Sequence, residues 1–315
     1  MRPRALATAA VVAFAVVPAP PASAATADEP LKQGDFAGSF GTGHGRSMYL
    51  ECHGKGSPTV VLDSGLRNGA SFWDQRSAET PPGPTVLPGV AAFTRVCAYD
   101  RPGTINTSEP PFALSRSSVA PMPRTAADAV SDLHALLTVA KVPGPYVFVA
   151  HSYGGLVDRL YTATYRREVA GMVLVDALAE YLQDALNATQ MTAYGAINNG
   201  AVRGLDYPGL ERIRFVASFD QMRRAQRRHP LRGIPVTVIS KGLPSGLPDE
   251  LPGGLTPALL EGAWTRMGNK LAKLTPDAVH VVAKRSSHYV MLTQPELIVD
   301  QVRRVVRLAR RSRAS

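Results

Sequence analysis

Tyr146-Val147-Phe148-Val149-Ala150-His151-Ser152-Tyr153-Gly154-Gly155 is the stretch from which the fold can be inferred. It begins as a short apolar run, typical of a buried strand, and then changes to small residues around Ser152. Apolar residues follow at helical spacing over 156–161, so the stretch predicts a strand, a sharp turn and a helix. This layout is that of a nucleophile elbow, in which the turn lifts the serine Oγ above the sheet edge. The alternative is a passive serine in a glycine-rich turn, and Ala150 does replace the first glycine of the usual Gly-x-Ser-x-Gly pattern.

The N-terminus has the pattern of a secretory signal peptide. Arg2 and Arg4 precede an apolar run, Ala5–Val17, and a small-residue cleavage site, Ala22-Ser23-Ala24. We expect residues 1–24 to be removed, which leaves 291 of the 315 residues for one large α/β domain of a secreted protein. A membrane anchor is the alternative, but the apolar run is too short to span a bilayer.

The composition excludes some classes of function. The formal net charge is +10, with arginines gathered in 212–232 and 303–313, but no nucleic-acid motif accompanies them. We interpret these stretches as solvated basic faces and expect no nucleic-acid partner. The seven histidines are scattered, with no two at i and i+4, so we expect no metal site. After the signal peptide no apolar run is long enough to anchor the chain in a membrane.

Strand patterns alternate with helical patterns along most of the chain. We expect strands at 35–40, 46–53, 59–62, 94–99, 146–150, 172–175, 235–239 and 278–283, and helices from Thr125, over 256–271 and from about Pro295. Alternation of this kind predicts a doubly wound, mainly parallel sheet. Residues 177–233 interrupt it, because they appear helical, polar and arginine-rich. We therefore expect a core of 25–176 and 234–315, with 177–233 inserted as a helical lid.

Four polar loops leave the carboxyl ends of the predicted strands. They contain Ser64–Gly69, Ser152, Asp176 and His288. Chemistry in doubly wound sheets gathers at these strand ends, so we expect the four loops to converge.

At this point the sequence resembles the α/β-hydrolase family, and within it the secreted actinobacterial serine hydrolases. The matching residues are Val61-Leu62-Asp63-Ser64-Gly65-Leu66, Ala98-Tyr99-Asp100-Arg101-Pro102-Gly103, Val149-Ala150-His151-Ser152-Tyr153-Gly154-Gly155, Val173-Leu174-Val175-Asp176 and Ser287-His288. The resemblance covers 46–177 and 235–305, but not the predicted lid. It implies an eight-stranded sheet and a catalytic triad in the chain order Ser, acid, His.

Each triad role has a chemical reason. Ser152 is a weak nucleophile until a base takes its proton, and His288, in a polar loop after the last strand, can act as that base. A carboxylate must then orient the imidazole, and we assign this role to Asp176. In many family members the acid follows the next strand, so Asp249 and Glu250 remain alternatives. His151 is interpreted as packing or polar lining.

The family also implies an oxyanion hole made of two main-chain N–H groups. One belongs to the residue after the nucleophile, here Tyr153, and the other to the loop after the third strand, here Leu66. The neighbouring N–H of Arg67 is the alternative to Leu66.

The two cysteines are Cys52 and Cys97. An even pair in an exported chain suggests a disulfide. In the family's strand order the second and fourth strands are neighbours, which implies a Cys52–Cys97 bridge between them.

Taken together, the residues and the resemblance predict a secreted, monomeric serine hydrolase. We expect it to cleave an ester or related acyl bond of a small molecule through an acyl-enzyme, without a cofactor. An acyltransferase or a cofactor-free perhydrolase would use the same triad with another acceptor. Two alternatives have no catalytic activity: a binding protein with the hydrolase fold, and a basic protein that binds to surfaces.

Overall fold

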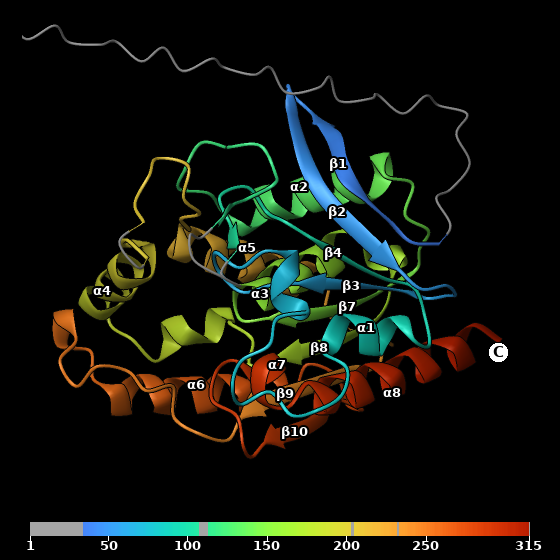
Figure 1. The fold of residues 1–315 in the computed structure, drawn as a ribbon. Helices are drawn as coiled ribbons and strands as arrows, with labels where there is room; N and C mark the ends of the chain where they lie inside the picture. The colour runs from blue at the N-terminus through green and yellow to red at the C-terminus, as the bar shows by residue number, and fades with distance from the viewer. Residues whose placement is uncertain (1–33, 107–112, 203–204, 232, 315) are drawn as a thin grey trace, which may run out of the picture.

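The computed structural model describes residues 34–106, 113–202, 205–231 and 233–314. A central sheet has helices on both faces (Figure 1). The expected signal peptide, residues 1–24, lies outside the described residues. Within the described ranges, no helix has the length and apolar character needed to cross a membrane.

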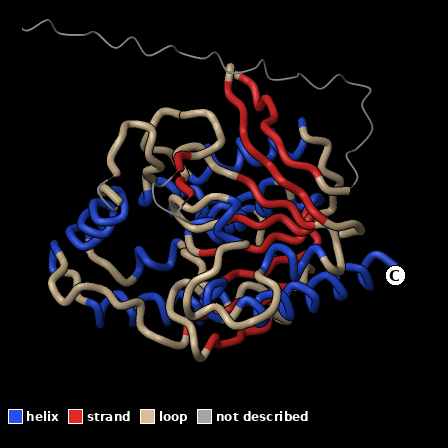
Figure 2. The backbone as a smooth tube through the Cα atoms, viewed as in Figure 1, coloured by secondary structure: helices blue, strands red, loops and turns tan. Residues whose placement is uncertain are grey.

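The central sheet has eight strands in the order β1-β2-β4-β3-β7-β8-β9-β10. The pairings β1–β2 and β2–β4 are antiparallel and the others are parallel. Figure 2 shows the strands of the sheet in red among the blue helices. The strands are β1 (Phe36–Gly43), β2 (Arg46–His53), β3 (Thr59–Asp63), β4 (Val96–Tyr99), β7 (Tyr146–His151), β8 (Val169–Val175), β9 (Val236–Lys241) and β10 (Val279–Ala283), and a separate small ladder pairs β5 (Ile105–Asn106) with β6 (Ala113–Leu114). The predicted mainly parallel, eight-stranded sheet is confirmed.

Alternating side chains of the central strands fill two separate cores. Val147 and Val149 of β7 belong to one core, whereas Phe148 and Ala150 belong to the other. Because successive residues of a strand point to opposite faces, a strand covered on both faces must be apolar at nearly every position. This explains why β7 appears in the sequence as an uninterrupted apolar run.

The helices divide between the two faces of the sheet. They are α1 (Val86–Ala91), α2 (Ala126–Val139), α3 (Tyr153–Thr164), α4 (Ala188–Asn199), α5 (Phe215–Arg228), α6 (Pro257–Leu271), α7 (Val290–Thr293) and α8 (Pro295–Ala314), with 3₁₀ turns η1 (Ala70–Trp73), η2 (Arg166–Glu168), η3 (Glu180–Asp184) and η4 (Pro252–Gly254). Residues of α1, α7 and α8 pack in one core, and residues of α2, α3, α5 and α6 in the other. Helix α2 begins beside Thr125, as expected, at a capping box in which Thr125 and Asp128 cap each other's main-chain N–H.

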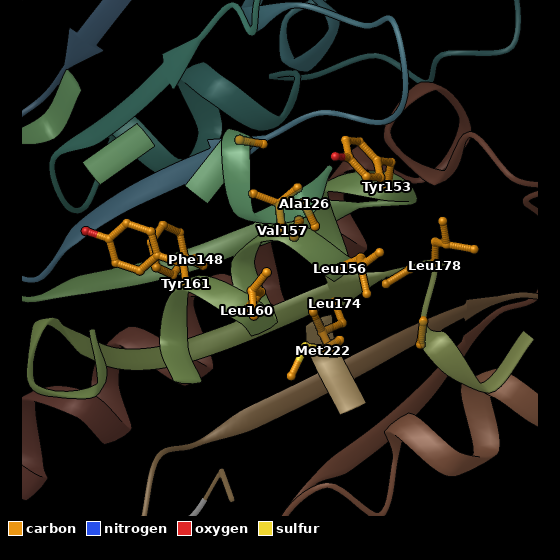
Figure 3. Close-up of a cluster of buried hydrophobic side chains, with 14 of the residues drawn as sticks. Ala126, Phe148, Tyr153, Leu156, Val157, Leu160, Tyr161, Leu174, Leu178 and Met222 are labelled. Carbon is orange, nitrogen blue, oxygen red and sulfur yellow. The ribbon is translucent and has the colours of Figure 1, made fainter. Parts of the chain in front are cut away.

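Helix α3 is enclosed on all sides, and every residue from Tyr153 to Ala163 is buried. Figure 3 shows its side chains in one cluster with Phe148 and Leu174 of the sheet and Met222 of α5. A helix packed on two sides has little freedom to shift, so its first residue is held firmly against the sheet edge.

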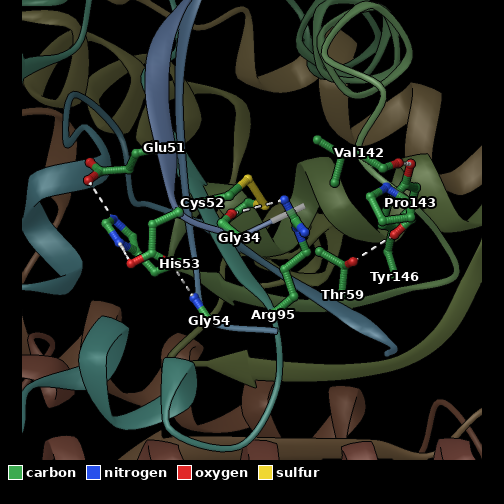
Figure 4. Close-up of a disulfide and its surroundings, with 12 residues drawn as sticks. Gly34, Glu51, Cys52, His53, Gly54, Thr59, Arg95, Val142, Pro143 and Tyr146 are labelled. Carbon is green, nitrogen blue, oxygen red and sulfur yellow. Dashed lines mark hydrogen bonds and ion pairs between the residues drawn. A yellow bond between two sulfur atoms is a disulfide. The ribbon is translucent and has the colours of Figure 1, made fainter. Parts of the chain in front are cut away.

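Cys52 and Cys97 form the disulfide that was predicted. The two residues face each other in the antiparallel β2–β4 pair, with their Cα atoms 4.0 Å apart (Figure 4). The bridge therefore joins neighbouring strands near the start of the domain.

Within 177–233, the residues that the structure describes form three helical pieces, η3, α4 and α5. Helix α5 packs against α2 and α3, so this part of the segment covers two helices of the core. Helix α4 lies at one side of the molecule (Figure 1), where it packs against η4. The arginines described in this segment are exposed or half-buried, as their desolvation cost led us to expect. The segment's boundaries as a lid remain a prediction.

Candidate active site

Ser152 occupies a strained turn between β7 and α3. Its backbone has φ 50° and ψ −119°, a conformation that few residues other than glycine adopt. The turn is held by three hydrogen bonds: the Ser152 N–H donates to the carbonyl of Val175, and the Ser152 carbonyl accepts from Leu178 and Gly155 at 2.8 and 3.0 Å. Strain that is fixed in this way is typical of functional turns.

The small residues after Ser152 are required by close backbone approach. A Cβ on Gly154 would lie 2.6 Å from the carbonyl oxygen of Asp63, and one on Gly155 would lie 2.4 Å from the Cβ of Ala177. Ala150, two residues before the serine, is fully buried within β7, so the structure accommodates its methyl group. The requirement for small residues is therefore strict after the serine and relaxed before it.

Asp176 and His288 meet at the strand ends. Asp176 follows β8, and its Oδ2 lies 2.7 Å from Nδ1 of His288. Its other oxygen accepts the main-chain N–H of Lys241 at 3.2 Å. The Asp176 side chain is 2% exposed and that of His288 is 23% exposed, so the carboxylate is enclosed while the imidazole reaches the surface of a pocket. The alternative acids, Asp249 and Glu250, are exposed.

His151 supports the loop that contains His288. Its Nε2 lies 2.9 Å from the main-chain oxygen of His288, and since a carbonyl only accepts, this nitrogen carries the proton. Complete burial, followed by the proximity of His288, holds the pKa of His151 well below its ordinary value. His151 therefore stays neutral and holds the position of the main chain beside it, a role that its place next to the serine did not indicate.

The loop Ser64–Gly69, which we call the oxyanion loop, lies against Ser152. A Cβ on Gly65 would come within 3.2 Å of the Ser152 Cβ. Two N–H groups of the loop are already engaged, because Arg67 donates to Glu211 Oε2 at 2.5 Å and Asn68 donates to Gly65 at 3.1 Å. The alternative oxyanion donor, the Arg67 N–H, is thus occupied by a carboxylate.

Sequence reasoning missed two buried charged residues behind this loop. Arg101 was noted only within a stretch that matches the α/β-hydrolase family, and Glu211 only as part of the predicted lid, and neither was assigned a role in the chemistry. Their side chains are each 4% exposed and form an ion pair. Burial of a charge pair depends on distant parts of the chain meeting, so no local pattern could have shown it.

A pocket of about 240 Å³ opens beside Ser152 and His288. Its walls are mainly apolar and come from α4, α6 and the loop between β9 and α6, including Tyr194, Leu247, Leu260 and Trp264. The polar part of the lining includes Lys241, paired with Glu261 at 2.8 Å. Among the residues that the structure describes, no group of three or more histidine, cysteine or carboxylate side chains could hold a metal ion.

Comparisons with known proteins agree with this architecture. The model of a family described as "Alpha/beta hydrolase family" matches residues 60–301. An "AB hydrolase superfamily protein" of Gibberella zeae is 26% identical over 80% of this chain and 87% of its own length. Two solved structures share the fold: a bromoperoxidase from Bacillus anthracis (TM-score 0.59, 18% identity, 86% of this chain and 100% of that chain) and a thermophilic esterase from Thermogutta terrifontis (TM-score 0.54, 17% identity, 87% and 98%).

Proposed function

Since this chain belongs to the α/β-hydrolase family, which supports a hydrolytic activity, we propose that it is a serine hydrolase cleaving an ester or related acyl bond. The observation that carries the proposal is the 2.7 Å contact between Asp176 and His288 at the pocket that Ser152 also lines. These three residues come from the ends of β8, β10 and β7, where a doubly wound sheet gathers its chemistry.

The triad would act in two steps. In the first, the Ser152 Oγ attacks the acyl carbon while Nε2 of His288 accepts the hydroxyl proton, which it then gives to the leaving alcohol. In the second, His288 takes a proton from water and the water oxygen attacks the acyl carbon. The bond between that carbon and the Ser152 Oγ then breaks, the carboxylic acid leaves, and the proton returns from His288 to Ser152. Asp176 holds Nδ1–H, so that Nε2 is free to accept, and it stabilises the imidazolium ion.

The developing oxyanion needs fixed donors. We assign these to the main-chain N–H groups of Tyr153, at the start of α3, and of Leu66 in the oxyanion loop. The occupied N–H of Arg67 supports the choice of Leu66. Together the steps require no cofactor.

The lining of the pocket supports a small substrate with an apolar part. Tyr194, Leu247, Leu251, Leu260 and Trp264 offer apolar surface within about 240 Å³, a size that suits a short or medium acyl group better than a long lipid chain. The protein is further proposed to act as a monomer.

We also propose that the protein is secreted. The N-terminal pattern of residues 1–24 supports export, and the Cys52–Cys97 disulfide is compatible with an oxidising compartment. N-terminal sequencing of the protein recovered from culture medium should begin at Ala25. Recovery of the whole chain inside the cell would oppose this proposal.

Covalent labelling tests the serine mechanism. A fluorophosphonate probe should label the parent protein covalently, and the parent protein should also hydrolyse short-chain p-nitrophenyl esters. Both the labelling and the hydrolysis should disappear in Ser152→Ala. Loss of a triad nucleophile costs on the order of 10⁶-fold in kcat in a well-studied protease. Undiminished hydrolysis in Ser152→Ala would end the proposal, and failure of the parent to label or turn over would favour a binding protein. Added alcohol or peroxide then separates hydrolysis from transfer to another acceptor.

A further inference from the structure

Glu211 comes from the predicted lid but lies behind the oxyanion loop. It belongs to the connection between α4 and α5, and it is 3% exposed. Its main chain is fixed by a hydrogen bond from its N–H to the carbonyl of Gly103 at 2.9 Å, and its neighbours Leu210 and Ile213 are buried. The carboxylate is therefore held rigidly against the core.

This carboxylate contacts the oxyanion loop directly and through Arg101. Glu211 Oε2 accepts the N–H of Arg67 at 2.5 Å, and Oε1 accepts Nε–H of Arg101 at 2.6 Å. The two far nitrogens of Arg101 then donate to the carbonyls of Ser64 and Gly65 at 2.9 and 2.7 Å. The loop is thus tied on both sides of Leu66.

These contacts determine which way the Leu66 N–H points. The carbonyl of Gly65 and the N–H of Leu66 belong to the same peptide group, which is planar and trans, so the two point in opposite directions. Since Arg101 binds the carbonyl at 2.7 Å, the N–H is directed away from the guanidinium. A positive charge on the carbonyl side also polarises the peptide group and makes its N–H a stronger donor.

The charges of the cluster support a permanently ionised Arg101. Burial opposes its charge, but Glu211 and Asp63 raise the pKa of Arg101 well above its ordinary value. Asp63 also binds Nη1 of Arg101. Burial, and then the proximity of Asp63, raise the pKa of Asp158 well above its ordinary value, which favours the neutral form of this carboxyl group.

We propose that Glu211 is a positioning residue for the reaction, which sets the direction of the Leu66 N–H through Arg67 and Arg101. The predicted lid then supplies part of the catalytic support as well as a pocket wall. This inference rests on the proposed serine hydrolase function.

The test replaces the charge and keeps the shape, with Glu211→Gln. Its amide cannot accept all the N–H groups that now face the carboxylate. We expect kcat for a p-nitrophenyl ester to fall about 10- to 100-fold, which does not exceed the fall in kcat that removal of an oxyanion donor causes. We expect KM to change by less than about threefold. Affinity for phenylboronic acid, whose serine adduct is tetrahedral, should fall by a similar factor. Asp206→Asn is the matched control, since Asp206 is an exposed acid of the same segment, paired with Arg212.

The outcomes separate positioning from mere structural support. A folded Glu211→Gln that keeps parental kcat, or one that loses kcat while its boronate affinity is unchanged, overturns the inference. If Glu211→Gln does not fold, Arg101→Lys and Glu211→Asp are measured in the same assays. Each substitution keeps the charge but shifts the hydrogen bonds to the oxyanion loop, so unchanged kcat and boronate affinity in both variants would overturn the inference. Ser152→Ala is measured alongside: if it stays active, the serine mechanism itself is wrong, whatever Glu211 does.

Discussion

The elbow over 146–164 and the segment 177–233 both contribute to the pocket, but they are built in different ways. In the elbow, consecutive residues form strand, turn and helix, and Ser152 is presented by the local backbone. In the segment, Glu211 is positioned by contacts with distant loops, at Arg67 and Arg101, while Tyr194 of α4 lines the pocket. The geometry of the elbow is therefore determined by neighbouring residues in the sequence, whereas the position of the segment depends on tertiary packing.

The two regions are also joined by a buried ion pair. Arg159 of α3 donates to both carboxylate oxygens of Glu180 in η3, at 2.6 and 3.0 Å, and both side chains are almost fully buried. A bidentate arginine–carboxylate pair is a geometrically specific link. The start of the segment is therefore held by the helix that follows the nucleophile.

The largest effect should come from the carboxylate that orients His288. Asp176→Asn should keep the fold and lower turnover by about 10⁴-fold, because an amide favours the wrong histidine tautomer. Asp249→Asn and Glu250→Gln, in the exposed loop, are the controls and should retain near-parental turnover. If Asp176→Asn stays active while either control is inactive, the acid belongs to that loop.

A glycine-to-alanine exchange should have opposite effects in the two regions. Gly154→Ala places a Cβ against the Asp63 carbonyl at 2.6 Å, and we expect a loss of about 1–3 kcal/mol in stability and of about 100-fold in labelling rate. Gly195→Ala in α4 meets nothing closer than 3.9 Å, and its helix should gain up to about 1 kcal/mol. Urea unfolding and fluorophosphonate labelling measure both. Equal losses would contradict the contrast between the regions.

The elbow should also give the fold a pH dependence through His151. Its pKa is below the ordinary value in the folded state, so below about pH 6.5 the unfolded chain binds a proton that the folded chain refuses. This contribution to stability is present above about pH 6.5 and is lost progressively as pH falls from 6.5 toward 5. Urea unfolding of the parent and of His151→Gln at pH 6.5 and pH 5 isolates the contribution of His151, because the other titratable groups contribute equally to both proteins. Identical pH slopes would rule this role out.

The smallest effect should come from the pocket wall supplied by α4. Tyr194→Ala enlarges the pocket without touching the triad, so KM for short acyl esters should rise by up to about tenfold while kcat changes only a fewfold. Preference should move toward longer acyl chains in a series of p-nitrophenyl esters. A large loss of kcat with unchanged chain preference would show that α4 affects the chemistry and not the pocket.

Much of the fold could be predicted because it rests on short-range patterns. The apolar runs at 59–62 and 172–175 lie within β3 and β8, and the capping box at Thr125 marks the start of α2. Boundaries were less accurate: β8 begins at Val169, because the central sheet extends pairing beyond the apolar run. The four polar strand-end loops were identified by position along the chain alone.

Residues of the site could be predicted only where their role follows from a position just after the carboxyl end of a strand. His288 and Asp176 could be proposed in this way, yet the choice between Asp176 and the later acids stayed open, because both loops leave the same edge of the sheet. The support of His288 by His151 was not visible, since it joins residues 137 positions apart.

The sequence by itself determined the order of strands and helices, the strand–turn–helix around Ser152 and the apolar character of both sheet faces, because these depend on the conformational preferences and polarity of neighbouring residues. Only the tertiary structure decided that Glu211 meets Arg101 behind the oxyanion loop, and that α5 packs on α2 and α3 while α4 borders the pocket. Such contacts join residues far apart in the chain, 110 positions for Glu211 and Arg101 and 92 for Ser218 of α5 and Ala126 of α2, and they form only once the packed core has brought both partners out of water.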